Sequence, residues 1–180
     1  MRDCLIVVDF QNDFITGVLG NDYARAVVPN ILNKIRAYID SGRPIIFTRD
    51  THMEETYFNT HEGKWLPIAH CIRRTEGYEL QPDAAKLVEF YDHAYVTDKA
   101  TFGYTGWSSS IYGFNSIEIV GVMTDICVVT NALFIRAMFP ELDIFVDANC
   151  CAGTTKENHE AALRVMNSCH IEVRNGENGI

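Results

Sequence analysis

One cysteine stands where a thiol could act as a nucleophile. Cys127 follows a β-branched run that ends in a glycine and precedes a long apolar-periodic segment, IVGVMTDICVVTNALFIRAM over 119–138. We expect Thr124 or Asp125 to cap a helix there, so that Cys127 lies in its first turn. The N–H groups and dipole of a helix start favour an anion and lower the pKa of a thiol, and a nearby lysine lowers it further. The alternative is a buried cysteine that packs the helix on a sheet.

Further polar residues end the other predicted strands. Asp9 interrupts an apolar strand at its last position, and Asp50 and Lys99 end two more. Open parallel sheets bind ligands at the carboxyl ends of their strands, so these side chains should meet Cys127 at one edge. A carboxylate placed like Asp9 either faces solvent or transfers protons. Asp13 could simply belong to a turn, and Lys99 could be a solvated strand end.

The long polar segment 51–81 offers metal ligands. Long loops in compact domains are usually functional or disordered. Carboxylate and imidazole groups of the kind that bind zinc, iron or manganese gather here: Asp50, His52 and His70. His61 and Glu62 are further candidate ligands. The alternative is a polar loop with surface histidines.

The elements that must position these residues alternate between strand and helix. Apolar runs predict strands at 4–10, 44–50, 94–99, 116–122, 143–148 and 170–173. Helical periodicity predicts helices at 23–42, 82–90, 125–139 and 156–168. Such alternation is typical of a mostly parallel sheet covered by helices on both faces. We therefore predict a three-layer αβα fold with roughly six strands, in a single domain spanning 1–180.

Composition excludes several classes of protein. The chain has 180 residues, of which 47% are hydrophobic and 22% charged, as in globular proteins rather than disordered ones. A formal net charge of −9 argues against a nucleic-acid partner. No segment has the length of a membrane span and the start lacks a signal-peptide pattern, so we expect a cytoplasmic protein. The six cysteines are expected to be free thiols in that compartment.

Several motifs occur in the order of a known family. They are DFQNDF from Asp9, RDTH from Arg49, GKWLPIAHC from Gly63, DKATFG from Asp98, GVMTDICVVTNA from Gly121, VDANCCAG from Val146 and NHEAAL from Asn158. With these motifs the chain resembles the isochorismatase-like cysteine hydrolases, and within them the nicotinamidase branch. The resemblance covers nearly the whole chain, and the first motif together with the Cys127 motif is the most specific part of it.

The resemblance implies roles for individual residues. Asp9, Lys99 and Cys127 would form a catalytic triad. Backbone N–H groups of Met123 and Cys127 would bind the substrate oxygen, beside a cis peptide bond after Val122.

The resemblance also implies a divalent metal ion, with zinc the first choice and iron or manganese as alternatives. Asp50, His52 and His70 would hold it, with Glu62 as a further acidic ligand. A homo-oligomer is expected as well.

The expected activity is hydrolysis of a small amide, with nicotinamide giving nicotinate and ammonia through a thioester. Phe14 and Trp65 would be apolar walls of the substrate pocket. Thr51 replaces a tryptophan and Arg74 a glycine that are common in nicotinamidases, and both bear on the choice of amide. The alternatives are another small amide, a carbamoyl or ureido compound, a hydrolase that uses metal-bound water, and an inert binding module of the same fold.

Overall fold

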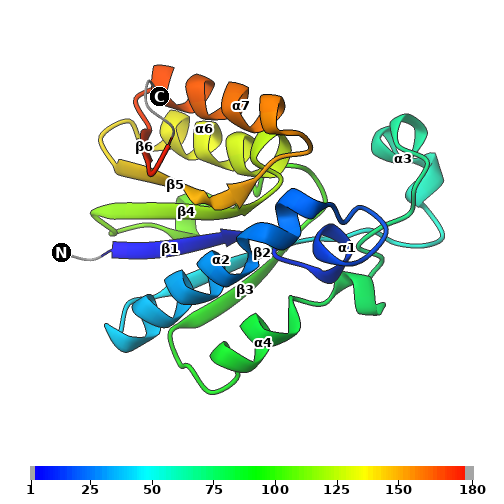
Figure 1. Ribbon diagram of the computed structural model, residues 1–180, viewed down its shortest axis with the longest axis horizontal. Helices are drawn as coiled ribbons and strands as arrows, with labels where there is room; N and C mark the ends of the chain where they lie inside the picture. Colours follow the sequence, from blue (N-terminus) through cyan, green and yellow to red (C-terminus); the bar gives the residue numbers. More distant parts are fainter. Residues whose placement is uncertain (1–2, 177–180) are drawn as a thin grey trace.

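A single parallel sheet forms the centre of the molecule, seen in the computed structural model of Figure 1, which describes residues 3–176. Within these residues the sheet has six strands in the order β3-β2-β1-β4-β5-β6, and all neighbours are parallel. The strands are β1 Asp3–Val8, β2 Ile45–Asp50, β3 Ala94–Lys99, β4 Ser116–Val122, β5 Asp143–Ala152 and β6 Glu172–Arg174. The predicted three-layer α/β fold is therefore confirmed.

Helices cover both faces of the sheet, which gives the three layers (Figure 1). The helices are α1 Asn12–Ile15, α2 Asp22–Asp40, α3 His61–Trp65, α4 Pro82–Val88, α5 Trp107–Ser110, α6 Val129–Met138 and α7 Lys156–Ser168. One apolar cluster joins α2 and α4 to the sheet, and a second joins α5, α6 and α7 to the opposite face. Strands covered on both sides read as continuous apolar runs, which explains why the sequence predicted them.

Two strands end two or more residues away from the predicted position. β1 stops at Val8 rather than Phe10, because Asp9 turns the chain with a φ of +48°. β5 runs on to Ala152, past a register shift in its pairing with β4, so it is longer than the apolar run 143–148. A bulge of this kind adds residues to a strand that no alternation pattern reveals.

The polar segment 51–81 is ordered rather than one irregular loop. It contains α3 and two short 3₁₀ helices, Tyr57–Asn59 and Glu76–Tyr78. One bridge pairs His52 with Ile72 inside the segment, and another pairs Leu80 with Gln11, which follows β1. Figure 1 shows α3 standing away from the sheet, on the side where the strands end.

A buried ion cluster connects α2 to the sheet. The Nζ of Lys34 lies 2.7 Å from Glu118 Oε1 on β4 and 2.8 Å from Asp147 Oδ2 on β5. The hydroxyl of Tyr38 donates to the other Glu118 oxygen at 2.9 Å. Both carboxylates are buried, so this lysine holds their charges inside the fold.

All six cysteines are free thiols, as expected, and five of them are buried. None of the helices within residues 3–176 has both the length and the apolar character needed to cross a membrane.

Candidate active site

A buried lysine connects the residues that the sequence singled out. The Nζ of Lys99 lies 2.7 Å from Asp9 Oδ2, 3.3 Å from Asp50 Oδ1 and 3.6 Å from Cys127 Sγ. All four side chains are at most 5% exposed. The carboxyl ends of β1, β2, β3 and β4 thus bring an acid, an ammonium group and a thiol together, as the strand order requires.

Asp9 is held in place by the neighbouring strand. The hydroxyl of Thr48 on β2 donates to Asp9 Oδ1 at 2.6 Å, while the Asp9 N–H donates to the Thr48 carbonyl at 3.2 Å. The positive φ of Asp9 is unusual for a residue with a side chain and persists only where neighbours fix it. Its second carboxylate oxygen is thereby directed at Lys99.

Burial controls the charges in this cluster. It raises the pKa of Asp9 above its usual range, and the nearby Lys99 ammonium offsets this only in part. Burial opposes the charge of Lys99, but the surrounding Asp9, Cys127 and Asp50 raise the Lys99 pKa well above its usual value. The cation is therefore retained, and a carboxylate with a raised pKa is suited to accept a proton.

The expectation of a lowered thiol pKa at Cys127 is wrong. Burial raises the Cys127 pKa well above its ordinary value, and the charges of Asp9 and Asp50 add to this, while Lys99 opposes them. Two carboxylates surround one ammonium group, so a third negative charge is disfavoured. These contributions favour the neutral thiol over the thiolate at Cys127.

The predicted cap of the Cys127 helix is also wrong. The turn Thr124–Val128 is a π-helix whose N-cap is Met123, and no side chain caps it. Thr124 instead shares a 2.8 Å hydrogen bond with His159 of α7, and Asp125 accepts one from the Thr154 N–H at 2.8 Å. Thr124 therefore fastens the Cys127 turn to α7, and Asp125 fastens it to the loop that precedes α7. The peptide bond between Val122 and Met123 is cis, as the resemblance implied.

A buried amide on the next helical turn supports Cys127. Asn131 Nδ2 donates to the Cys127 carbonyl at 2.8 Å and to the Phe102 carbonyl at 3.1 Å. Its Oδ1 accepts from the Tyr104 N–H and from Trp107 Nε1 at 2.8 and 2.9 Å. Sequence reasoning missed Asn131, although a polar residue inside an apolar-periodic segment was a signal for it.

Gly121 allows the strand ends to approach one another. Its φ is +126°, and a Cβ at this position would lie 2.1 Å from the Val8 carbonyl oxygen on β1. Glycine is required on both counts, because no other residue fits the conformation or the space. The close approach places Val8, the residue before Asp9, beside Gly121, which shortly precedes the turn that holds Cys127.

Four candidate ligand side chains converge beside the Lys99 cluster. Asp50, His52, Glu62 and His70 each offer one donor atom, and these four atoms lie within 4.8 Å of one another. Asp50 Oδ2 is 2.9 Å from His52 Nε2 and 3.3 Å from His70 Nε2. Glu62 Oε1 is 3.4 Å from His70 Nε2. Two imidazole nitrogens and two carboxylates fit zinc, iron or manganese.

The outer surroundings of this cluster also suit a metal ion. His70 Nδ1 lies 2.8 Å from the Ile68 carbonyl, which fixes the ring and leaves Nε2 facing the cluster. His61, the other histidine candidate, is exposed and stacks on Trp65 with 6.3 Å between ring centres. The segment therefore brings Glu62 to the cluster and leaves His61 outside it.

Asp50 belongs to both groups, since Oδ1 faces Lys99 and Oδ2 faces the two histidines. Burial alone would raise the pKa of Asp50, but hydrogen bonds from His52 and His70 and the charge of Lys99 lower it below its usual range. Asp50 therefore stays ionised, as a metal ligand must be.

Gln11 was also missed, and it positions Asp50. Its Nε2 donates to the Asp50 carbonyl at 2.9 Å and to the Tyr78 carbonyl at 2.8 Å, and its Oε1 accepts from the Asp50 N–H at 2.7 Å. Gln11 is fully buried. The only signal for it was its place two residues after Asp9.

The two predicted pocket walls differ in position. Phe14 is buried with its ring edge-on to His70, at 5.7 Å between ring centres. Trp65 is 85% exposed on α3. Phe14 thus borders the metal-ligand cluster, whereas Trp65 lies at the surface and forms no buried wall.

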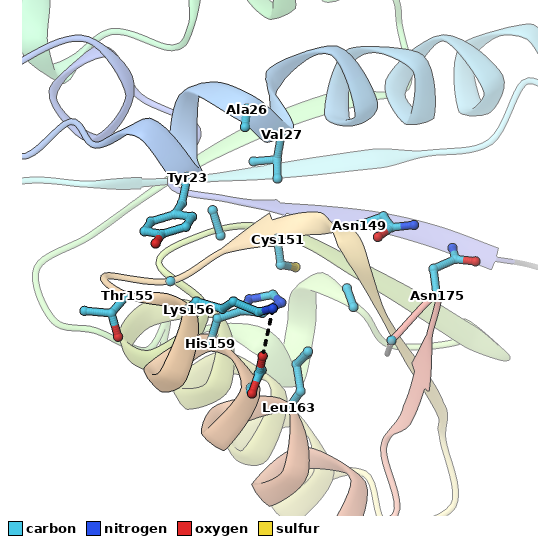
Figure 2. Close-up of a pocket in the computed structure, with 15 residues that line it drawn as sticks. Tyr23, Ala26, Val27, Asn149, Cys151, Thr155, Lys156, His159, Leu163 and Asn175 are labelled. Carbon is cyan, nitrogen blue, oxygen red and sulfur yellow. Dashed lines mark ion pairs between the residues drawn. The ribbon is translucent and has the colours of Figure 1, made fainter. Parts of the chain in front are cut away.

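A separate cavity of about 260 Å³ lies between α2, β5 and α7 (Figure 2). Tyr23 and Val27 of α2, Cys151 of β5 and His159 of α7 are among its walls. None of the predicted triad residues and none of the candidate metal ligands lines it. The cavity is connected to the Cys127 turn by the hydrogen bond between His159, which lines the cavity, and Thr124.

Comparison with known proteins gives a consistent assignment. The isochorismatase domain model matches residues 3–178. A nicotinamidase of Schizosaccharomyces pombe is 25% identical and aligns over 94% of this chain and 91% of its own length. The crystal structure of the nicotinamidase/pyrazinamidase PncA of Bacillus subtilis is 26% identical, covers 97% of this chain and 100% of its own, and has a TM-score of 0.87.

A further solved structure contains a metal. The pyrazinamidase of Pyrococcus horikoshii, determined in complex with zinc, is 26% identical and has a TM-score of 0.81 over 96% of this chain and 98% of its own. Sheet order, site geometry and the family model lead to the same result: the chain belongs to the isochorismatase domain family.

Proposed function

We propose that this protein hydrolyses a small carboxamide, with nicotinamide as the leading substrate, through a thioester on Cys127. The chain is a hydrolase of amide carbon–nitrogen bonds, in keeping with its family and its nicotinamidase relatives. The observation that carries the proposal is the single ammonium group of Lys99 in contact with Asp9, Cys127 and Asp50. This arrangement provides a base, a nucleophile and a fixed positive charge in one buried site.

The first half of the reaction forms the thioester. Asp9 takes the proton of the Cys127 thiol as the sulfur attacks the amide carbon, and the carbonyl electron pair moves to the oxygen. Backbone N–H groups of Met123 and Cys127 stabilise this oxyanion; loss of one such donor typically costs about 3 kcal/mol of barrier. The carbon–nitrogen bond then breaks, and Asp9 returns its proton to the departing ammonia.

The second half regenerates the enzyme. Asp9 removes a proton from a water molecule that attacks the thioester carbon, the carbon–sulfur bond breaks, and the acid leaves as the thiol is restored. Lys99 remains an ammonium group throughout and keeps the charges of Asp9 and the sulfur stable in a buried site. This role agrees with its raised pKa.

The metal cluster has a separate part in the proposal. Asp50, His52, Glu62 and His70 would hold a divalent ion, with zinc the first choice because a zinc-bound relative has the same fold. When bound, the ion supplies a Lewis acid that orients a substrate donor atom such as a ring nitrogen. Phe14 borders this position and would pack against the substrate.

Replacing Cys127 with alanine tests the central step. Ammonia release from nicotinamide should fall to background, because no other group of the triad can form the thioester. Cys169→Ala removes an exposed thiol and is the matched control, which should keep full activity. Ammonia release by Cys127→Ala at the wild-type rate would refute the thiol mechanism.

A panel of amides tests the substrate. Nicotinamide, pyrazinamide, a carbamoyl amine and a ureido compound should be compared by kcat/KM, with nicotinamide expected to be the best. Turnover of the carbamoyl or ureido compound alone would replace nicotinamide as substrate and leave the triad in place. Location in the cytoplasm and assembly into a homo-oligomer stay predictions, to be checked by fractionation and by sedimentation.

A further inference from the structure

Asp13 is a buried carboxylate that the proposed reaction does not use. Its side chain lies in α1, four residues after Asp9, and is 9% exposed. Its Oδ2 accepts a hydrogen bond from the Cys71 N–H at 2.7 Å, across 58 residues of sequence. The sequence pattern allowed Asp13 to be a simple turn residue, whereas the structure makes it a long-range contact to the metal-ligand segment.

Cys71, whose N–H binds the Asp13 carboxylate, connects two candidate metal ligands. Cys71 directly follows His70, and its carbonyl accepts from the His52 N–H at 3.0 Å. Its φ is +46°, a conformation that a residue with a side chain adopts only when its surroundings impose it. The Asp13 carboxylate and the His52 N–H therefore hold the two sides of Cys71, and through it the backbone of both histidines.

Two glycines pack so closely against the Asp13 carboxylate that a side chain on either would clash with it. A Cβ on Gly77 would lie 2.1 Å from Asp13 Oδ2, and one on Gly17 would lie 2.4 Å from Asp13 Oδ1. Among residues 3–176 the positive-φ glycines are 42, 113 and 121, so Gly77 has a backbone that alanine could adopt and is glycine for reasons of space. A carboxylate enclosed in this way has little freedom to leave the Cys71 N–H.

We propose that Asp13 is a positioning residue for the metal centre, which sets the direction of His70 and His52 by fixing the Cys71 backbone. The inference rests on the proposed metal site and goes beyond the ligands themselves. Groups that orient ligands in this manner typically change metal affinity 10- to 100-fold when they are removed.

Zinc affinity of the full chain is the measurement, made by competition between the protein and a chromophoric chelator. Asp13→Ala should bind Zn²⁺ about 10- to 100-fold more weakly than the wild type. Asp13→Asn should stay close to the wild type, because the amide oxygen can accept the same N–H. Gly77→Ala keeps every polar group and displaces the carboxylate, so it should lose affinity as Asp13→Ala does.

Asn12→Ala is the matched control. It removes a side-chain hydrogen bond of 2.8 Å to Glu76 in the same segment, away from the histidines, and should keep wild-type zinc affinity. Melting of the metal-free variants separates loss of folding from loss of positioning; if Asp13→Ala does not fold, Gly77→Ala decides.

The outcomes distinguish the inference from the proposed function. A wild-type protein that binds no zinc overturns the metal centre and the inference with it, while the thiol chemistry is tested separately. Zinc binding by the wild type with equal affinity in Asp13→Ala or Gly77→Ala overturns the positioning role alone. The positioning role would also be overturned if Asn12→Ala lost as much zinc affinity as Asp13→Ala, or if folded Asp13→Asn did.

Discussion

Replacement of Lys34 by methionine tests how the fold tolerates its buried charges. The variant keeps most of the side-chain volume and removes the cation that lies 2.7 Å from Glu118 and 2.8 Å from Asp147. Both carboxylate side chains are at most 8% exposed, so neither gains enough water to replace the lysine. Breaking a buried ion pair on one side typically destabilises a protein by about 3–5 kcal/mol. Because the Lys34 side chain itself is 23% exposed, we expect the free energy of unfolding to fall by about 3 kcal/mol.

The pH dependence of this loss follows from Asp147. Burial alone would raise the Asp147 pKa, but Lys34 and Asn175 lower it below its ordinary value. In the wild type this carboxylate therefore contributes stability above its unfolded pKa, and the contribution is lost as the pH falls through the folded pKa. Without Lys34 burial dominates, the folded pKa rises, and protonation then favours the folded variant. The difference between the two proteins should shrink as the pH falls from 7 toward about 4.

Urea unfolding followed by circular dichroism at pH 7 and at about pH 4.5 measures both effects. Lys86→Met is the control, since its pair with Asp83 is exposed at 3.7 Å and should be worth less than about 1 kcal/mol. A Lys34→Met penalty no larger than that of the control, or one that is the same at both pH values, would refute this account of the cluster.

Two further predictions concern the active site. Lys99→Met should reduce kcat/KM by on the order of 10⁴-fold, because triad members act as a unit, and steady-state ammonia release checks this; a loss below tenfold would remove the lysine from the chemistry. Asn131→Ala leaves the Tyr104 N–H and Trp107 Nε1 without their acceptor and should destabilise the protein by about 3 kcal/mol in urea unfolding, whereas an unchanged midpoint would contradict the hydrogen-bond network.

Much of the fold could be predicted from the sequence because buried parallel strands leave a plain signal. The run CLIVV before Asp9 is apolar on both faces, and the run IEIV before Gly121 is apolar except for Glu118; each ends next to a residue of the site. Parallel pairing then placed Asp9, Lys99 and Cys127 at one edge without any knowledge of contacts. The bulge of β5 left no such pattern and was not predicted.

The parts of the site that were missed depend on partners far away in the chain. Gln11 and Asp13 bind backbone groups 39 and 58 residues away, so no local spacing distinguishes them from turn residues. The Cys127 pKa was misjudged because the first helical turn was considered without its burial, which here outweighs the lysine. Trp65 was expected to line the pocket, whereas α3 carries it to the surface.

The two oxygens of Asp50 have a consequence for anyone who alters this protein. One small side chain is in contact with the ammonium group on one side and with both imidazoles on the other. A metal ion bound at the two imidazoles, or a substitution beside Lys99, would therefore not act in isolation, because each would alter the electron density that the same carboxylate offers to the other. Redesign of the Lys99 cluster or of the metal-ligand cluster has to treat the two as one unit.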